Sequence, residues 1–133
     1  MTAPLNVKTV PGQYAVAQLP PHTEIPTWAT GHGFVSVSLA EDEITIVCLQ
    51  ERVPEGLKAD RDWACLRTIG PFDFDAAGIV HSLISPLSAN GIGVFVVCTF
   101  DGEHLLVANK DLEKAKTYLI NAGHILVDAD YDP

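Results

Sequence analysis

The chain has 133 residues, of which 47% are hydrophobic and 19% are charged. This composition suits one ordinary domain or two very small ones and argues against a disordered chain. The formal net charge of −9, from 17 acidic and 8 basic residues, argues against nucleic-acid binding because it repels phosphate backbones. There is neither an apolar run approaching the roughly 18 residues of a membrane helix nor a signal-peptide pattern, so we expect no membrane association.

The cysteines and histidines do not form the patterns of a catalytic or metal site. Cys48, Cys65 and Cys98 are odd in number, widely spaced and placed in apolar runs, so we expect core side chains in a reducing cytoplasm. The five histidines are dispersed and none has the spacing of a zinc enzyme. No GxSxG turn, phosphate loop or dinucleotide fingerprint is present. We therefore expect no enzyme activity, no metal and no cofactor.

The first half of the chain is typical of short strands joined by turns. Four apolar segments predict strands at residues 5–10, 13–19, 34–39 and 44–49. Pro11-Gly12 predicts a turn between the first two strands, and the last two predict a hairpin. Residues 24–29 are too short and too rich in proline for more than one or two helical turns. A break at residues 53–56 divides the chain into predicted domains of residues 1–58 and 59–133.

The second half predicts the order strand, helix, strand, strand, helix, strand. These elements cover residues 63–69, 79–87, 92–100, 105–107, 109–122 and 125–127. Asp73 and Asp75 are candidate N-caps of the first helix, Pro86 lies near its end, and Gly91 closes it. Gly123 is the predicted C′ residue of the second helix.

Two further features define the predicted second module. The near-continuous apolar run at residues 92–100 predicts a central strand covered on both faces, and Asp101-Gly102 predicts a hairpin turn after it. The element order is that of the ferredoxin-like split βαβ motif. We therefore predict an α+β fold of two such modules that share a core, in which the first module is degenerate and its helices are shortened or lost.

Several segments carry a resemblance to a known family. They are residues 11–16, 34–38, 43–48, 51–56, 70–74 and 90–95, followed by residues 98–101, 105–107 and 111–112. In this order and spacing the chain resembles the small bacterial ACT-domain proteins that are related to aspartate kinase regulatory domains and to CASTOR-type amino-acid sensors. The resemblance covers nearly the whole chain and implies two tandem ACT-like modules of βαββαβ topology.

The resemblance also implies a function. It implies a non-catalytic regulatory protein that binds an amino acid and acts as a homodimer, with the ligand near the end of the first helix and the next strand. The implied ligand-binding residues are Asn90, Gly91, Ile92, Val94, Thr99, Phe100 and Glu103. Ala89 stands where related sensors often carry an acidic residue, and Glu103 where aspartate is usual, so the identity of the amino acid stays open.

Other interpretations remain open from the residues alone. Gly91 can be only a helix-ending glycine, and residues 92–100 only a core strand. The chain can be a ligand-free interaction module that pairs with a metabolic enzyme or with itself. It can also be a small lyase or hydrolase that uses Glu103, His104 or His32. The aspartates at residues 128–132 lack the turn glycine and closing glutamate of a calcium loop, so a solvated tail is expected.

Overall fold

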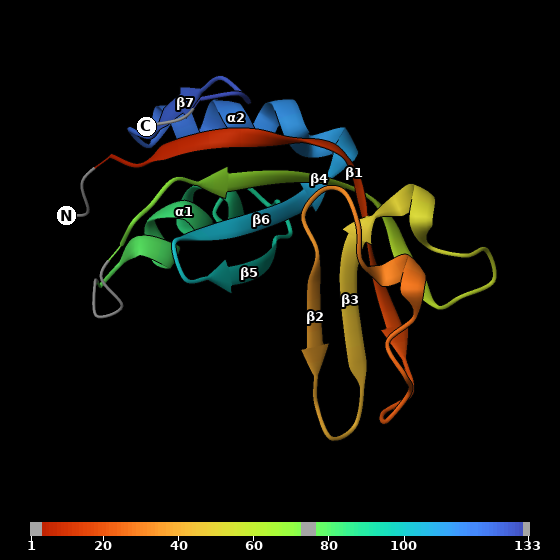
Figure 1. The fold of residues 1–133 in the computed structure, drawn as a ribbon. Helices are drawn as coiled ribbons and strands as arrows, with labels where there is room; N and C mark the ends of the chain where they lie inside the picture. The colour runs from red at the N-terminus through yellow and green to blue at the C-terminus, as the bar shows by residue number, and fades with distance from the viewer. Residues whose placement is uncertain (1–3, 73–76, 132–133) are drawn as a thin grey trace. The chain divides into compact units, whose positions relative to one another are not determined.

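The computed structural model describes residues 4–72 and 77–131 (Figure 1). The strands are β1 (Asn6–Leu19), β2 (Ser36–Leu39), β3 (Ile44–Leu49), β4 (Ala59–Thr68), β5 (Phe95–Thr99), β6 (Gly102–Ala108) and β7 (Ile125–Val127). The α-helices are α1 (Ile79–Ser88) and α2 (Leu112–Asn121), and three 3-10 turns are η1 (Thr27–Ala29), η2 (Gln50–Arg52) and η3 (Asn109–Asp111). None of the helices in these two ranges is long and apolar enough to cross a membrane.

The chain divides into two compact units. Unit 1 comprises residues 1–10 and 64–133, and unit 2 comprises residues 11–63. Each unit has its own cluster of buried apolar side chains. The predicted boundary between residues 58 and 59 and the predicted shared core both stay predictions.

Strand β1 corrects one prediction made from the sequence. It runs without interruption through Pro11 and Gly12, where a turn was expected. Gly12 has a φ of +100°, and a Cβ there would lie 2.6 Å from Cδ2 of Leu49, so the backbone conformation and the available space both require glycine. The predicted turn is wrong because the residues on both sides pair as strands: residues 14–19 with β3, and residues 6–8 with β7.

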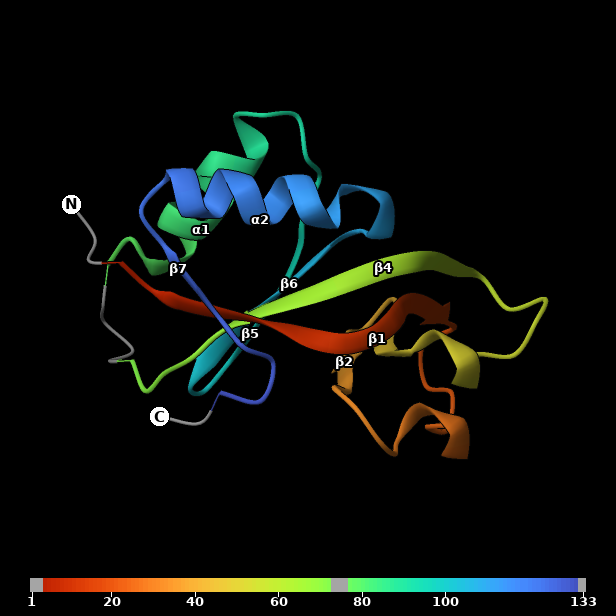
Figure 2. The same ribbon diagram turned by 90° about the horizontal axis from the view of Figure 1, so that it is seen from above.

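Unit 1 has the ferredoxin-like order that the sequence predicts. From β4 to β7 the elements are strand, helix, strand, strand, helix, strand. The spatial order of its strands is β7-β1-β4-β6-β5. Both helices lie on the same side of these strands (Figure 2). The cluster between helices and strands includes the fully buried side chains of Leu66, Leu83, Leu87, Leu105 and Leu119.

Strand β5 corrects a second prediction. It lies at the end of the strand order, beside β6, so it is an edge strand. Its first three residues are half-buried and its last two, Cys98 and Thr99, are exposed. The prediction of a core side chain is therefore wrong for Cys98, whereas Cys48 and Cys65 are buried as predicted. The central strand covered on both faces is therefore wrong for this segment. An apolar, β-branched run fits an edge or a central strand, and the choice is made by long-range pairing: β6, with four successive buried residues, takes the inner place.

Both helices end in a Schellman motif, as their glycines predict. At α1 the N–H of Gly91 donates to the carbonyl oxygen of Ser88 (3.1 Å), and the N–H of Ile92 donates to that of Leu87 (3.0 Å). The equivalent two hydrogen bonds close α2 around Gly123. The φ angles of Gly91 and Gly123 are +78° and +99°, the left-handed region that favours glycine.

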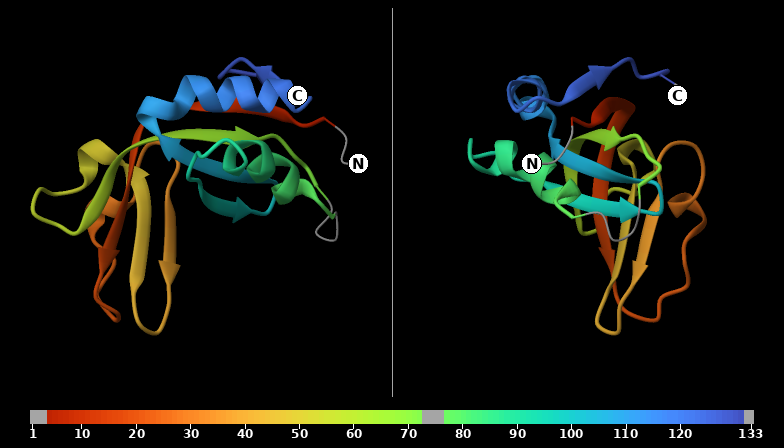
Figure 3. Two further views of the ribbon diagram at one scale, coloured as in Figure 1. Left: turned by 180° about the vertical axis from the view of Figure 1, so that it is seen from behind. Right: turned by 90° about the vertical axis from the view of Figure 1, so that its left-hand side faces the viewer.

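Unit 2 contains strands and short 3-10 turns. The predicted hairpin is confirmed: β2 and β3 pair antiparallel with Ser36 opposite Val47 and Leu39 opposite Ile44 (Figure 3). Residues 24–29 give only the one-turn helix η1, also as predicted. The buried side chains of Ala15, Ala17, Ile44, Ile46 and Cys48 belong to the cluster of this unit. The helical structure of unit 2 is therefore limited to the 3-10 turns η1 and η2, and the interpretation of this unit as a degenerate copy stays a prediction.

Candidate ligand-binding pocket

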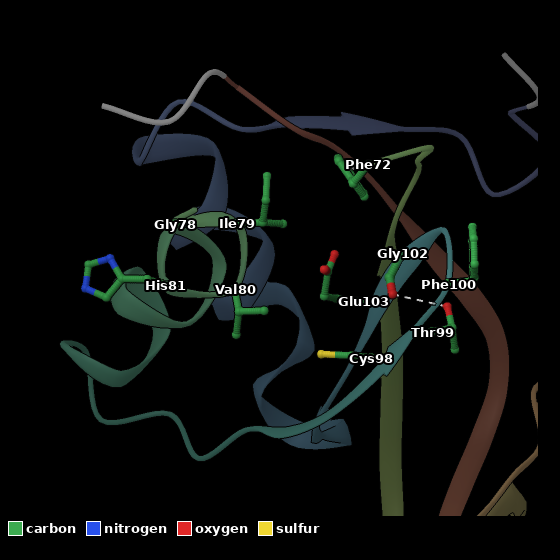
Figure 4. A pocket seen from close by; sticks show the side chains of 10 residues that line it. All are labelled: Phe72, Gly78, Ile79, Val80, His81, Cys98, Thr99, Phe100, Gly102 and Glu103. Carbon is green, nitrogen blue, oxygen red and sulfur yellow. Dashed lines mark hydrogen bonds between the residues drawn. The ribbon is translucent and has the colours of Figure 1, made fainter. Parts of the chain in front are cut away.

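A pocket of about 390 Å³ lies in unit 1, between the first turn of α1 and the hairpin of β5 and β6 (Figure 4). It is lined by Phe72, Gly78, Ile79, Val80, His81, Cys98, Thr99, Phe100, Gly102 and Glu103. This volume lies in the range of roughly 300–1,000 Å³ that is typical of small-molecule sites.

The hairpin brings three of the seven predicted site residues into this pocket. Thr99 pairs with Gly102 across a two-residue turn, so Thr99, Phe100 and Glu103 come together at one end of the hairpin. The Thr99 hydroxyl donates to the carbonyl oxygen of Gly102 (3.1 Å). Phe100 is 74% exposed, a large apolar surface for a residue at a turn.

Glu103 is held in a fixed orientation. The buried Thr68 hydroxyl donates to Oε2 of Glu103 (2.7 Å), and the backbone N–H of Glu103 donates to the same hydroxyl oxygen (2.9 Å). The Glu103 side chain points toward α1 (Figure 4). A carboxylate that already has one hydrogen bond from a buried hydroxyl can still accept from a ligand ammonium group.

The start of α1 supplies hydrogen-bond donors, whereas Glu103 supplies an acceptor. Gly78 is the N-cap in the left-handed conformation, with a φ of +82°, and as a glycine it makes no side-chain cap hydrogen bond to the helix. The first N–H groups of a helix have no intrahelical acceptor and carry partial positive charge, so Ile79 and Val80 present a favourable environment for an anion. His81 also lines the pocket, but its ring points away from it (Figure 4). The candidate N-caps Asp73 and Asp75 lie outside the described residues.

The other four predicted site residues lie beyond the far end of α1 and do not line this pocket. The side-chain amide of Asn90 donates to the carbonyl oxygen of Pro86 (2.7 Å), which helps to close the helix. Gly91 holds the Schellman motif, Ile92 is buried in the core of unit 1, and Val94 packs against that core. Each of them thus has a structural role in ending the helix or filling the core.

Phe72 and the residues at the start of α1 line the pocket but were not predicted as site residues from the sequence. These residues come more than 15 positions before Thr99, so no local pattern joins them to the hairpin. One signal was present: Gly78 immediately precedes the apolar helical pattern, and glycine at that place favours a positive φ. It predicts a left-handed residue just before the helix, but it does not predict a pocket there.

The chemistry of the pocket and its surroundings does not favour catalysis. Burial, and then the negative charge of Glu103, raise the pKa of the Cys98 thiol, so a nucleophilic thiolate is disfavoured at neutral pH. Glu103 and His104 are neighbours on β6 and therefore point to opposite faces of the sheet. Within residues 4–72 and 77–131, no group of three or more histidine, cysteine or acidic side chains could hold a metal ion.

Comparison with known proteins places the chain in a family. The ACT-domain family model matches residues 58–121, and the model of an N-terminal domain family matches residues 12–56. A protein from Agobacterium tumefaciens with a known crystal structure is 48% identical, with a TM-score of 0.90, over 99% of this chain and 98% of that chain. Residues 58–121 belong to the ACT-domain family. The resemblance on which the sequence analysis relied is thereby confirmed.

The chain is also similar to two proteins whose names describe a sensing or regulatory role. The mouse cytosolic arginine sensor for mTORC1 subunit 1 is 32% identical over 101 residues; the match covers 70% of this chain but only 28% of that protein. The regulatory subunit of aspartate kinase from Thermus thermophilus, in its ligand-free form, matches with a TM-score of 0.63 and 12% identity, over 92% of this chain and 100% of that chain. The second likeness shows the fold alone.

Proposed function

We propose that this ACT-domain protein binds a free amino acid in the pocket of unit 1 and acts as a non-catalytic regulatory module. The observation that carries the proposal is the meeting of Thr99, Phe100 and Glu103 with the start of α1 in one pocket. The mouse relative, which is 32% identical, is named a cytosolic arginine sensor, which supports regulation by an amino acid.

The two ends of the pocket complement the two charges of an amino acid. The α-carboxylate is accommodated at the first N–H groups of α1, where the helix dipole favours negative charge. The α-ammonium binds the Glu103 carboxylate, whose orientation is fixed by Thr68. Phe72 and Phe100 offer apolar surface to the ligand side chain. Ligand contacts of Asn90, Gly91, Ile92 and Val94 remain a prediction.

The assembly and location belong to the same proposal. The protein acts as a homodimer in the cytoplasm, without a cofactor or nucleic acid. The edge position of β5 supports self-association, because an edge strand presents backbone groups that a second strand can pair. The cytosolic description of the mouse relative and three free cysteines support the location.

A thermal-shift screen against the twenty amino acids, with calorimetry on each hit, tests the proposal. A ligand at a hundredfold excess over its Kd stabilises the folded state by about 2.7 kcal/mol, which is a shift of roughly 2–8 °C for a chain of this size. Glu103→Gln should reduce the affinity at least tenfold, because it removes the charge that faces the ammonium. Glu113→Gln, the same change at an exposed position on α2, is the matched control.

The outcome separates the two candidate functions. Equal affinity of the Glu103 and Glu113 variants would remove the pocket from the proposal. No response to any amino acid at millimolar concentration, with a dimer in analytical ultracentrifugation, would favour the ligand-free interaction module. The exposed Phe100 and the edge strand β5 are the features that favour that alternative.

A further inference from the structure

We propose that a second pocket of unit 1 binds a small anion with a carboxylate or phosphate group, through Lys8 and Arg67. This pocket has a volume of about 320 Å³ and is lined by Lys8, Arg67, Ile69, Gly70, Pro71, Asp101 and Tyr131. Among residues 4–72 and 77–131, it shares no lining residue with the amino-acid pocket. The proposal therefore goes beyond the proposed function and does not depend on it.

Both cations are oriented by backbone oxygens rather than by carboxylates. The Lys8 Nζ donates to the carbonyl oxygen of Tyr131 (3.2 Å), and the Arg67 Nε donates to the carbonyl oxygen of Thr68 (3.1 Å). Neither side chain forms an ion pair with a carboxylate in residues 4–72 or 77–131. The chain has only 8 basic residues and a net charge of −9, so two cations that line one pocket are a local concentration of positive charge.

The charges around the pocket favour a small anion. Two cations that share a site repel each other, and an anion between them relieves that repulsion. Among the described residues that line the pocket, Asp101 is the acidic one, so the charges of Lys8, Arg67 and Asp101 sum to +1. His104 adds no charge at neutral pH, because burial and then Arg67 lower its pKa to about 4. A ligand with one or two negative charges fits this balance.

The residue types favour a carboxylate or phosphate group in particular. The guanidinium group of arginine is a planar fork that matches two oxygens of such a group, and the Nε hydrogen bond fixes the plane of Arg67. The Lys8 ammonium group adds a second positive charge that can contact the same ligand. The partial exposure of both side chains leaves the site open to solutes.

The two pockets lie on either side of one turn. Phe100 and Gly102 line the amino-acid pocket, whereas Asp101 between them lines the anion pocket. The backbone at Gly70 lies close to this turn. Only glycine fits there, because a Cβ at that position would collide with the carbonyl oxygen of Asp101.

Titration of the full chain with inorganic phosphate, and separately with succinate, tests the site at constant ionic strength. Backbone amide shifts in ¹H–¹⁵N NMR spectra should saturate and should be largest at Gly70 and Asp101. Lys8→Gln and Arg67→Gln should each weaken binding at least tenfold. Lys114→Gln, the same charge change on the exposed surface of α2, should bind like the wild type.

The results identify which chemical group the pocket binds, and they separate failure of this proposal from failure of the amino-acid proposal. Saturation by phosphate alone, or by succinate alone, supports the site and identifies the chemical group. Failure of both probes to saturate overturns the proposal, as does wild-type affinity in the Lys8 and Arg67 variants. If Arg67→Gln does not fold, Arg67→Lys replaces it, since it keeps the charge but loses the fork. Glu103→Gln should retain phosphate binding, so failure of the amino-acid proposal leaves this test intact.

Discussion

Replacement of the buried His104 by glutamine should reduce the loss of stability that the protein suffers in acid. His104 is 5% exposed, and burial followed by the charge of Arg67 lowers its pKa from 6.5 to about 4. Between these two pH values the unfolded chain binds a proton that the folded chain does not bind. The free energy of unfolding therefore falls as the pH drops through this window, and His104 has almost no effect above it.

The size of the effect follows from the two pKa values. The full shift of about 2.5 units, at 1.36 kcal/mol per unit, sets an upper bound of about 3 kcal/mol at pH values below 4. Between pH 7.5 and pH 5.5 the expected loss is about 1.4 kcal/mol. Measurement at pH 5.5 also avoids the isoelectric point near 4.7, where the protein carries least net charge.

Urea denaturation of the wild type and of His104→Gln at these two pH values measures the difference. Other titrating groups act in both proteins, so their contributions cancel in the comparison. His32→Gln, the same replacement in an exposed loop, should behave like the wild type. If His104→Gln loses as much stability between pH 7.5 and pH 5.5 as the wild type, the assignment of a neutral buried His104 is refuted.

Two further substitutions test the helix end and the support of the pocket. Gly91→Val should lower the free energy of unfolding by about 1–3 kcal/mol, because its φ of +78° is strained for a β-branched residue even though the site is open. Gly93→Val, at an equally open site without a positive φ, is the control in the same urea experiment, and equal stability of the two variants would contradict the argument. Thr68→Val should cost about 1–3 kcal/mol and weaken amino-acid binding in calorimetry, because Glu103 loses its buried donor. Thr117→Val, on the exposed surface of α2, should change neither quantity, and unaltered binding by Thr68→Val would show that Thr68 does not position Glu103.

Local signals in the sequence predicted most elements of the fold. The hairpin of β2 and β3, both α-helices and the glycines that end them follow from periodicity and helix-ending residues close in sequence. The two errors in strand placement arose where a distant segment decides the local structure, and the exposure of Cys98 follows from the second of them. Pro11-Gly12 has the composition of a turn, but the pairing of the flanking residues with β3 and β7 continues the strand. Residues 92–100 are apolar enough for a central strand, but β6 occupies the inner position.

The part of the candidate site that was predicted is the part whose residues are close in sequence. Thr99, Phe100 and Glu103 are within five residues of one another across a hairpin turn, so their proximity is a local property. Gly78 and the first turn of α1 reach the pocket only through the packing of the helix on the sheet. Such packing has no short-range signature, and a resemblance to a family directs attention to particular positions without giving their distances.

The discontinuity of unit 1 bears on the order of events during protein synthesis. Leu5 and His124, which are 119 residues apart in the chain, share a hydrogen bond, and Asn6 pairs with Ile125. The ribosome therefore releases the first strand of unit 1 long before its neighbour exists. All strand pairs between β1, β2 and β3 involve residues 14–49, so unit 2 can form these pairs earlier. Until β7 is synthesised, residues 6–8 lack the strand with which they pair in parallel, and this edge of β1 stays unpaired in the nascent chain.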